Sequence, residues 1–195
     1  MESTQVIANR NVSWIEVYDN VLSEDYCKEL VKRIDKDPRL TYVTDHKTYN
    51  LQQLILWGLD DWNDTNDFLT KKFLELAQAY YDKHMPLWPE DFLAESIKFK
   101  KYSADQGEYF KEHVDVDDNR SCVRFLTSLW FLNKVEKGGE TVFTDHRVSI
   151  EPRVGRVILF PPLWTHPHYS NPGSTDKFIF TQYLHYKSMK AEPLV

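Results

Sequence analysis

Hydrophobic and polar residues alternate with two different periods along this chain, and its N-terminal part predicts a short strand followed by a helix. Residues 13–22 alternate loosely between apolar and polar side chains, which is typical of a strand. Ser23 follows, and its hydroxyl can cap the free amides at the start of a helix. Glu24 and Asp25 suit the positive end of that helix, and Pro38 prevents its continuation. One face of the helix carries apolar residues at helical spacing: Tyr26, Cys27, Leu30, Val31 and Ile34.

A second, longer helix is predicted from Asn66 to about Met85, where Pro86 ends it. Its apolar residues again fall at helical intervals: Phe68, Leu69, Phe73, Leu76 and Tyr80. The region between the two helices has no clean period. Within it, residues 51–59 read LQQLILWGL, which is apolar enough for a short strand or for a loop that covers the core. The pattern leaves that choice open.

Beyond Pro89 the chain consists of short strand-like runs. These runs are rich in β-branched and aromatic residues and are separated by turn-formers such as the stretch SNPGSTD. This favours an antiparallel β sandwich or barrel supported by the N-terminal helices, a mainly β member of the α+β class. No repeat divides the chain, so we expect one domain over residues 1–195, with helical support at about 13–90 and the β core at about 91–188.

The composition changes this picture little, but it argues against some classes of partner. The net charge is −6 and the pI is about 5.6, so no general affinity for nucleic acid or for anionic lipid is expected. Aromatic residues make up 14% of the chain, which suggests a core or pocket lined by flat, rigid side chains. Cys27 and Cys122 are far apart, which fits reduced thiols and a cytoplasmic protein. No signal-peptide pattern and no run long enough to span a bilayer is found, so no membrane is expected.

Candidate metal ligands stand in two separate segments. His113 and Asp115 are two residues apart, so in an extended strand both point to the same side. A third ligand must come from elsewhere, and His166 and His168 follow an apolar strand. Two histidines and one carboxylate with open positions opposite are typical of iron(II) oxygenases, whereas closed zinc sites use four protein ligands. Taken alone, an HxD triplet beside further acids is more often solvated surface charge.

The order of several segments resembles the prolyl 4-hydroxylase-like branch of the iron(II) and 2-oxoglutarate dioxygenases, a family built on a double-stranded β-helix (jelly roll). The resemblance covers most of the chain. It implies the same fold here, with the N-terminal helices as support. The segments that carry it are DNVLSEDYCKEL, KYSADQGEYFKEHVD, RFLTSLWFLN, GGETVF and GRVILFPPLWTH.

The resemblance also implies roles for single residues. Counted from the preceding strand, His166 stands where the family usually places its second ligand histidine, so the expected metal and catalytic set is His113, Asp115 and His166. His168 is then expected nearby, either directly behind the metal ligands or at the substrate rim. Lys177 matches the basic residue that binds the far carboxylate of 2-oxoglutarate, although it comes eleven positions after His166 and the family commonly has nine or ten. Without the motif, Lys177 is equally well explained as an edge-strand lysine. The tyrosine that contacts the co-substrate is Tyr102, or its competitor Tyr109.

By the same resemblance, the chain is expected to be an enzyme that uses non-haem iron(II), 2-oxoglutarate and O2 to hydroxylate an unactivated C–H bond, with ascorbate as a reactivator. A prolyl residue in a peptide or protein is the first choice of substrate, and a free amino acid, small metabolite or nucleobase is the alternative. Arg124, Trp164 and His168 are the candidate substrate residues. Other aromatics that suit a groove are Trp57, Trp62 and Trp130, although core packing explains each equally well. The competing functions are a non-catalytic β-helix binding module and a cupin-like zinc or manganese protein.

Overall fold

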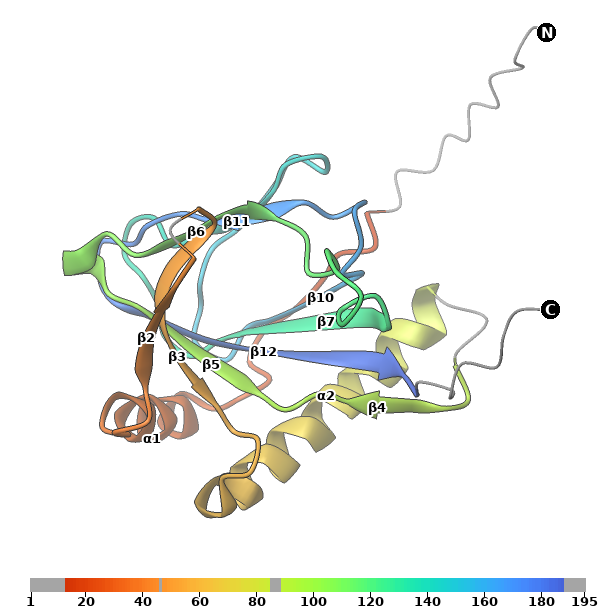
Figure 1. Cartoon of the computed structure of the whole chain (residues 1–195), viewed down its shortest axis with the longest axis horizontal. Coiled ribbons are helices and arrows are strands. Elements are labelled where there is room, and N and C mark those ends of the chain that lie inside the picture. The colour runs from red at the N-terminus through yellow and green to blue at the C-terminus, as the bar shows by residue number, and fades with distance from the viewer. Residues whose placement is uncertain (1–12, 46, 85–88, 188–195) are drawn as a thin grey trace, which may run out of the picture.

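The chain folds into a curled antiparallel sheet with two helices packed against one side of it (Figure 1). The computed structural model describes residues 13–45, 47–84 and 89–187. The helices are α1 (Glu24–Asp35) and α2 (Asn63–His84), with short 3₁₀ turns at Asp60–Trp62 and Ala104–Gln106. The strands are β1 (Glu16–Tyr18), β2 (Thr41–Thr44), β3 (Tyr49–Ile55), β4 (Phe92–Ala94), β5 (Lys98–Tyr102), β6 (Tyr109–His113), β7 (Arg124–Phe131), β8 (Thr141–Phe143), β9 (Val148–Ile150), β10 (Val157–Phe160), β11 (His168–Ser170) and β12 (Lys177–Tyr186).

The strands follow one continuous path, β1-β10-β7-β12-β5-β3-β6-β11-β8-β9, with β2 added to β3 and β4 added to β12. Every pair among the described strands is antiparallel. The long strands β7 and β12 pair near the middle of this path. Towards its other end the sheet curls round, so that β6 and β11 lie across the interior from β7 and β12 (Figure 1). The predicted antiparallel β arrangement is therefore present.

The two helices begin and end close to where the sequence places them. The Ser23 hydroxyl accepts a hydrogen bond from the Tyr26 amide at 3.2 Å, which is the predicted N-cap of α1. The buried residues of α1 are Cys27, Leu30 and Ile34, all from the predicted apolar face. Helix α2 starts at Asn63, three residues before its predicted start. Its predicted end at Met85 and Pro86 lies outside the described residues.

Of the stretch that the pattern left open, residues 51–55 form a strand and residues 56–59 follow it as a turn. Residues 49–55 make up β3, which pairs with β2 in a hairpin and also with β5 and β6. Its buried residues, Leu51 and Leu54, belong to different hydrophobic clusters, so both faces of the strand are covered. The polar pair Gln52 and Gln53 between them hides the two-residue period in the sequence.

Alternation along the strands separates two hydrophobic clusters. On β12, Phe178, Phe180 and Leu184 pack in the cluster that includes both helices. Ile179 points the other way, into a cluster inside the curl. Strands β5 and β7 divide in the same manner, with Phe99 and Trp130 towards the helices and Tyr102, Leu129 and Phe131 inside. The helices thus cover the outer face of the sheet, which leaves the inner face for a pocket.

Two further sequence expectations concern the cysteines and the membrane. Cys27 is buried and Cys122 is exposed, and both are free thiols. Among the helices in the described part of the chain, none is long and apolar enough to cross a bilayer.

Candidate active site

Three potential metal ligands meet where β6 and β11 run side by side inside the curl. His113 is the last residue of β6 and faces His168, the first residue of β11, across the antiparallel ladder. Asp115 follows two residues after His113. One ligand atom from each of these three side chains lies within 4.8 Å of the other two. Adjacent strands therefore bring together residues that are more than fifty positions apart in the sequence.

Backbone carbonyls hold both imidazole rings in one orientation. The Nδ1 atom of His113 lies 2.8 Å from the Lys111 carbonyl oxygen, and that of His168 lies 3.0 Å from the His166 carbonyl oxygen. Each Nδ1 can therefore donate its proton to a carbonyl, which leaves Nε2 with a free lone pair. The His113 ring also stacks on Phe110, with centroids 3.6 Å apart and planes within 3°. This tautomer is the form that a metal ion requires.

The Asp115 carboxylate is buried and held by hydroxyl groups from two other strands. Thr127 of β7 donates to Oδ2 at 3.1 Å, and Tyr183 of β12 donates to Oδ1 at 3.2 Å. Burial alone would raise the pKa of Asp115, but His168, His113 and Lys100 outweigh burial, so this pKa lies below its usual value. Burial also lowers the pKa of His113, to about 3. At neutral pH both groups are thus in the unprotonated form that binds metal.

His166 does not join this group, contrary to the sequence expectation. Its Nε2 lies 2.9 Å from the carbonyl oxygen of Ser13, and its Nδ1 lies 2.8 Å from the hydroxyl of Thr165. The reason is local. The His166 amide closes a turn onto the Leu163 carbonyl oxygen at 2.9 Å, and the extended strand starts only at His168. The group that could hold a metal ion therefore consists of His113, Asp115 and His168, and the expected His166 lies outside it.

A buried lysine and a tyrosine lie beside the pocket that contains these ligands. Lys177 is 1% exposed, and its Nζ donates to the Gly139 carbonyl oxygen at 3.0 Å and to the Ser170 hydroxyl. This ammonium lies 4.4 Å from the ring centroid of Tyr102, its neighbour across the β12–β5 ladder. Burial lowers the pKa of Lys177 to about 7. The pocket is lined by Lys100, Tyr102, Phe110, His113, Asp115, Thr127, Leu129, Thr141, Phe160, His168, Tyr169, Ser170, Ile179 and Thr181.

The lining of the pocket distinguishes between the two candidate tyrosines. Tyr102 lines the pocket, and burial raises its pKa well above the usual value. Tyr109 does not line it, but borders a shallow outer surface with Lys111, whose ammonium lies 5.5 Å from the Tyr109 ring. Of the pair, only Tyr102 is placed to contact a molecule in the pocket.

Residues 97–185, which contain the whole ligand set, match the sequence model of the 2OG-Fe(II) oxygenase superfamily. The match covers somewhat less than half of the chain, which in this region is similar to the 2OG-Fe(II) oxygenases. It is also 25% identical over 171 residues to a protein named "Putative prolyl 4-hydroxylase" from Acanthamoeba polyphaga mimivirus. That alignment covers 81% of this chain and 64% of the relative, so the chain spans less than two thirds of the relative's length.

Several solved structures that are similar to this chain are prolyl hydroxylases. The viral collagen prolyl hydroxylase of Paramecium Bursaria Chlorella virus-1, solved as its 2OG complex, superposes with a TM-score of 0.72 at 22% identity, over 91% of this chain and 98% of that one. A Pseudomonas putida prolyl-4-hydroxylase gives 0.68 at 17% identity, over 91% and 95% of the two chains. A Trichoplax adhaerens prolyl hydroxylase, solved with a peptide of hypoxia inducible factor, gives 0.73 at 14% identity, over 90% and 85%. These likenesses confirm the expected double-stranded β-helix fold.

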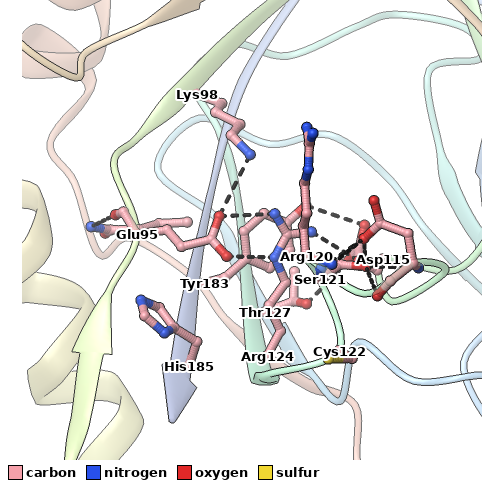
Figure 2. A network of polar contacts seen from close by, with 12 residues as sticks. Glu95, Lys98, Asp115, Arg120, Ser121, Cys122, Arg124, Thr127, Tyr183 and His185 are labelled. Carbon is pink, nitrogen blue, oxygen red and sulfur yellow. Dashed lines mark hydrogen bonds and ion pairs between the residues drawn. The ribbon is translucent and has the colours of Figure 1, made fainter. Parts of the chain in front are cut away.

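The Arg124 guanidinium is already occupied by contacts within the protein (Figure 2). Its guanidinium donates twice to the Glu95 carboxylate, at 2.5 and 2.9 Å, and once to the Asp115 carbonyl oxygen, at 2.8 Å. It also stacks over the Tyr183 ring at 3.9 Å. Lys98 reaches the same Glu95 carboxylate at 3.5 Å. Arg124 therefore anchors the loop that carries Asp115.

The tryptophans that suggested a substrate groove divide into two kinds. Trp62 and Trp130 are fully buried in the cluster between helices and sheet, so for these two the groove interpretation is wrong and they are core residues. Trp57 and Trp164 are 82% and 79% exposed. Trp164 lies in the turn before His166, on the same segment as Pro162, whose carbonyl oxygen accepts from the Asp115 amide at 3.1 Å. Trp164 thus remains available at the surface.

Sequence reasoning missed Lys100, which lines the pocket, and Thr127 and Tyr183, which hold the Asp115 carboxylate. Lys100 is 8% exposed and lines both the inner pocket and a wider cleft next to it. Burial lowers its pKa to about 8. One signal was available, because the run KFKKY alternates and puts Lys100 on the same side of β5 as Tyr102. No comparable signal marked Thr127 or Tyr183, which reach Asp115 only through sheet register.

Proposed function

We propose that this protein is an iron(II) and 2-oxoglutarate-dependent dioxygenase that holds its metal with His113, Asp115 and His168 and hydroxylates an unactivated C–H bond. The observation that carries this proposal is the convergence of these three side chains in one pocket, with both histidines oriented by backbone carbonyls. The similarity of residues 97–185 to the 2OG-Fe(II) oxygenases supports iron(II) as the metal and oxygenation as the reaction.

The donor set fits ferrous iron better than a structural metal. Two imidazole nitrogens and one carboxylate occupy part of a coordination sphere and leave positions open, whereas a closed zinc site uses four protein ligands. When bound, iron(II) with 2-oxoglutarate and O2 supplies the oxidising power for C–H hydroxylation. The residues of this chain bind, orient and shield those reactants. Thr127 and Tyr183 fix the carboxylate of Asp115.

Lys177 and Tyr102 are the proposed co-substrate residues. A buried ammonium beside the metal pocket is suited to the far carboxylate of 2-oxoglutarate, because each desolvated charge needs an opposite partner. Tyr102, whose ring lies 4.4 Å from this ammonium, lines the pocket itself. The burial of both residues keeps water away from the reacting centre.

For the substrate, a prolyl residue in a peptide or protein is the first proposal, supported by the prolyl hydroxylases that share this fold. A free amino acid, small metabolite or nucleobase is the alternative, since loops and pocket rims set specificity and differ within a fold. Cytoplasmic location is proposed on the two free thiols, Cys27 and Cys122.

The test measures turnover and metal binding in the same variants. Purified protein is mixed in air with iron(II), ascorbate and 2-oxoglutarate labelled at C1, and carbon dioxide release is followed without and with proline-containing peptides. His113→Ala, Asp115→Ala and His168→Ala are expected to abolish release and to lose iron to a chromophoric chelator. His166→Ala is the matched control, because its ring lies outside the group of ligands, and it is expected to keep both properties.

Different failures point to different rivals. Tight metal binding without any 2-oxoglutarate consumption favours a cupin-like zinc or manganese protein. Loss of both properties in His166→Ala but not in His168→Ala contradicts the proposed ligand set. No metal binding at all favours a non-catalytic module.

A further inference from the structure

Lys100 is placed in the pocket by the alternation of β5. Strand β5 lies between β12 and β3, and its residue Lys101 points outward, where its Nζ meets the Asp35 carboxylate of α1 at 2.5 Å. Lys100 points the opposite way, into the curl beside the metal ligands. Two consecutive lysines thus have different environments, one at the surface with an acid and one inside the site.

Lys100 has no hydrogen-bond or ion-pair partner within the described residues, although it is more than nine-tenths buried. The other two buried lysine or arginine side chains in the described part of the chain have hydrogen-bond partners, because Lys177 donates to Gly139 and Ser170, and Arg156 is paired with Asp19 at 2.6 Å. The Lys100 ammonium lies 5.1 Å from the centroid of the Phe110 ring, and it is attracted by the charge of Asp115 at longer range. A buried cation without a partner is costly, which points to an anion that arrives with a ligand.

Counting charges shows which ligand can bring that anion. A ferrous ion carries two positive charges, and Asp115 balances one of them. The two carboxylates of 2-oxoglutarate balance the remaining one and the ammonium of Lys177. No anion is then left for Lys100, so the loaded pocket would hold one unbalanced positive charge.

We propose that Lys100 binds a carboxylate of the substrate, close to the carbon that is hydroxylated. This inference rests on the proposed function and narrows its substrate class. Lys100 is suited to this task because it borders both the metal pocket and the wider cleft. That cleft is also lined by the cations Lys98 and Arg124 and by the acids Asp45 and Asp117, so Lys100 is the buried cation in it that has no acidic partner among the described residues. Lys177, by contrast, lies at the β12–β5 side of the inner pocket and does not border that cleft.

The carboxylate can come from two sources, and matched probes distinguish them. Free L-proline against L-prolinamide tests an α-carboxylate. Capped Ala-Pro-Glu against Ala-Pro-Gln, and capped Glu-Pro-Ala against Gln-Pro-Ala, test an acidic side chain on either side of the proline. Binding to the protein loaded with iron(II) and 2-oxoglutarate is measured by calorimetry without oxygen, and a gain of one oxygen atom is measured by mass spectrometry in air.

The acid member of at least one pair is expected to bind roughly tenfold or more tightly than its amide, the range for a hydrogen bond to a charged group. Lys100→Met, which keeps the length and removes the charge, is expected to abolish this preference while the dissociation constant for 2-oxoglutarate stays within about twofold. Lys100→Arg is expected to keep the preference. Lys101→Gln is the matched control, since it removes the neighbouring charge on the opposite face.

Three results would overturn the role of Lys100: no acid preference in the wild-type protein, an unchanged preference in Lys100→Met, or a tenfold weaker affinity for 2-oxoglutarate in that variant with the preference intact. Retained 2-oxoglutarate binding shows that the variant is folded, and Lys100→Gln serves in its place if it is not. Uncoupled 2-oxoglutarate consumption by the wild-type protein tests the proposed function separately, so the two ideas can fail independently.

Discussion

At the scale of one residue, burial of the Lys177 ammonium changes its pKa and favours the binding of an anion. Its ammonium has exchanged water for one carbonyl oxygen, one hydroxyl and the face of Tyr102. These neutral partners do not replace full hydration, which is why the pKa of Lys177 falls to about 7. A carboxylate that arrives beside the ammonium restores the charged form. Binding of 2-oxoglutarate and protonation of Lys177 should therefore be coupled.

The coupling predicts a pH dependence of co-substrate affinity. Below about pH 7 the free protein already carries the proton on Lys177, and the affinity should be constant. Above that pH the free protein has lost the proton and must regain it on binding, so the dissociation constant should rise about tenfold per pH unit. Anaerobic titration with 2-oxoglutarate between pH 6 and 9 measures this. Lys177→Arg stays charged and should give a flat profile; a flat profile in the wild type would contradict the coupling.

At the scale of elements, the loop between β6 and β7 is tied to the segment between β4 and β5. Arg124 joins the two by binding Glu95 with two hydrogen bonds and the Asp115 carbonyl oxygen with a third (Figure 2). A metal ligand binds more tightly when the protein already holds it in position. The hydrogen bond from Arg124 to the Asp115 backbone holds this ligand without involving the atoms that would bind the metal. Arg124 is thus proposed as a positioning residue.

Removal of the Glu95 charge should therefore weaken metal binding indirectly. Glu95→Gln is expected to lower the affinity for iron(II) about tenfold, the lower end of the range for residues that orient metal ligands. Chelator competition measures the affinity. Lys98→Gln is the control, because Lys98 contacts the same carboxylate at 3.5 Å but not the loop. Equal affinities for Glu95→Gln and wild type would show that Asp115 holds its place without this anchor.

At the scale of the whole molecule, we expect the fold not to depend on a bound metal. One hydrophobic cluster joins the helices to the outer face of the sheet, and a second fills part of the curl, with the ligands beside it. Burial of this apolar surface is the main stabilising term, and a bound ion adds to it only by mass action.

Metal removal should consequently lower the melting temperature without unfolding the protein. An ion at one hundred times its dissociation constant stabilises by about 2.7 kcal/mol, which for a chain of this length is a rise in Tm of roughly 5–10 °C. Calorimetry with and without a chelator checks this. His166→Ala should keep the rise and His168→Ala should lose it. An unfolded apo-protein at 25 °C would show that the ion is structural.

Much of this protein follows from its sequence, because periodicity and capping act over a few neighbouring residues. The cap at Ser23, the apolar face of α1 and the β-rich second half are all local patterns that the structure reproduces. The pair His113 and Asp115 is equally local, since two residues separated by one position in an extended segment share a side.

The tertiary structure alone decided which distant residues meet. The choice between His166 and His168 depends on the residue at which the turn ends and β11 begins. Both positions are histidines, so the pattern of apolar and polar residues does not show whether the strand starts at the first or the second. Thr127 and Tyr183 reach Asp115, and Lys100 lies among the metal ligands, because of the register of β5, β7 and β12. Register is set by the packing of the whole sheet, and a single strand's sequence carries too little of that information.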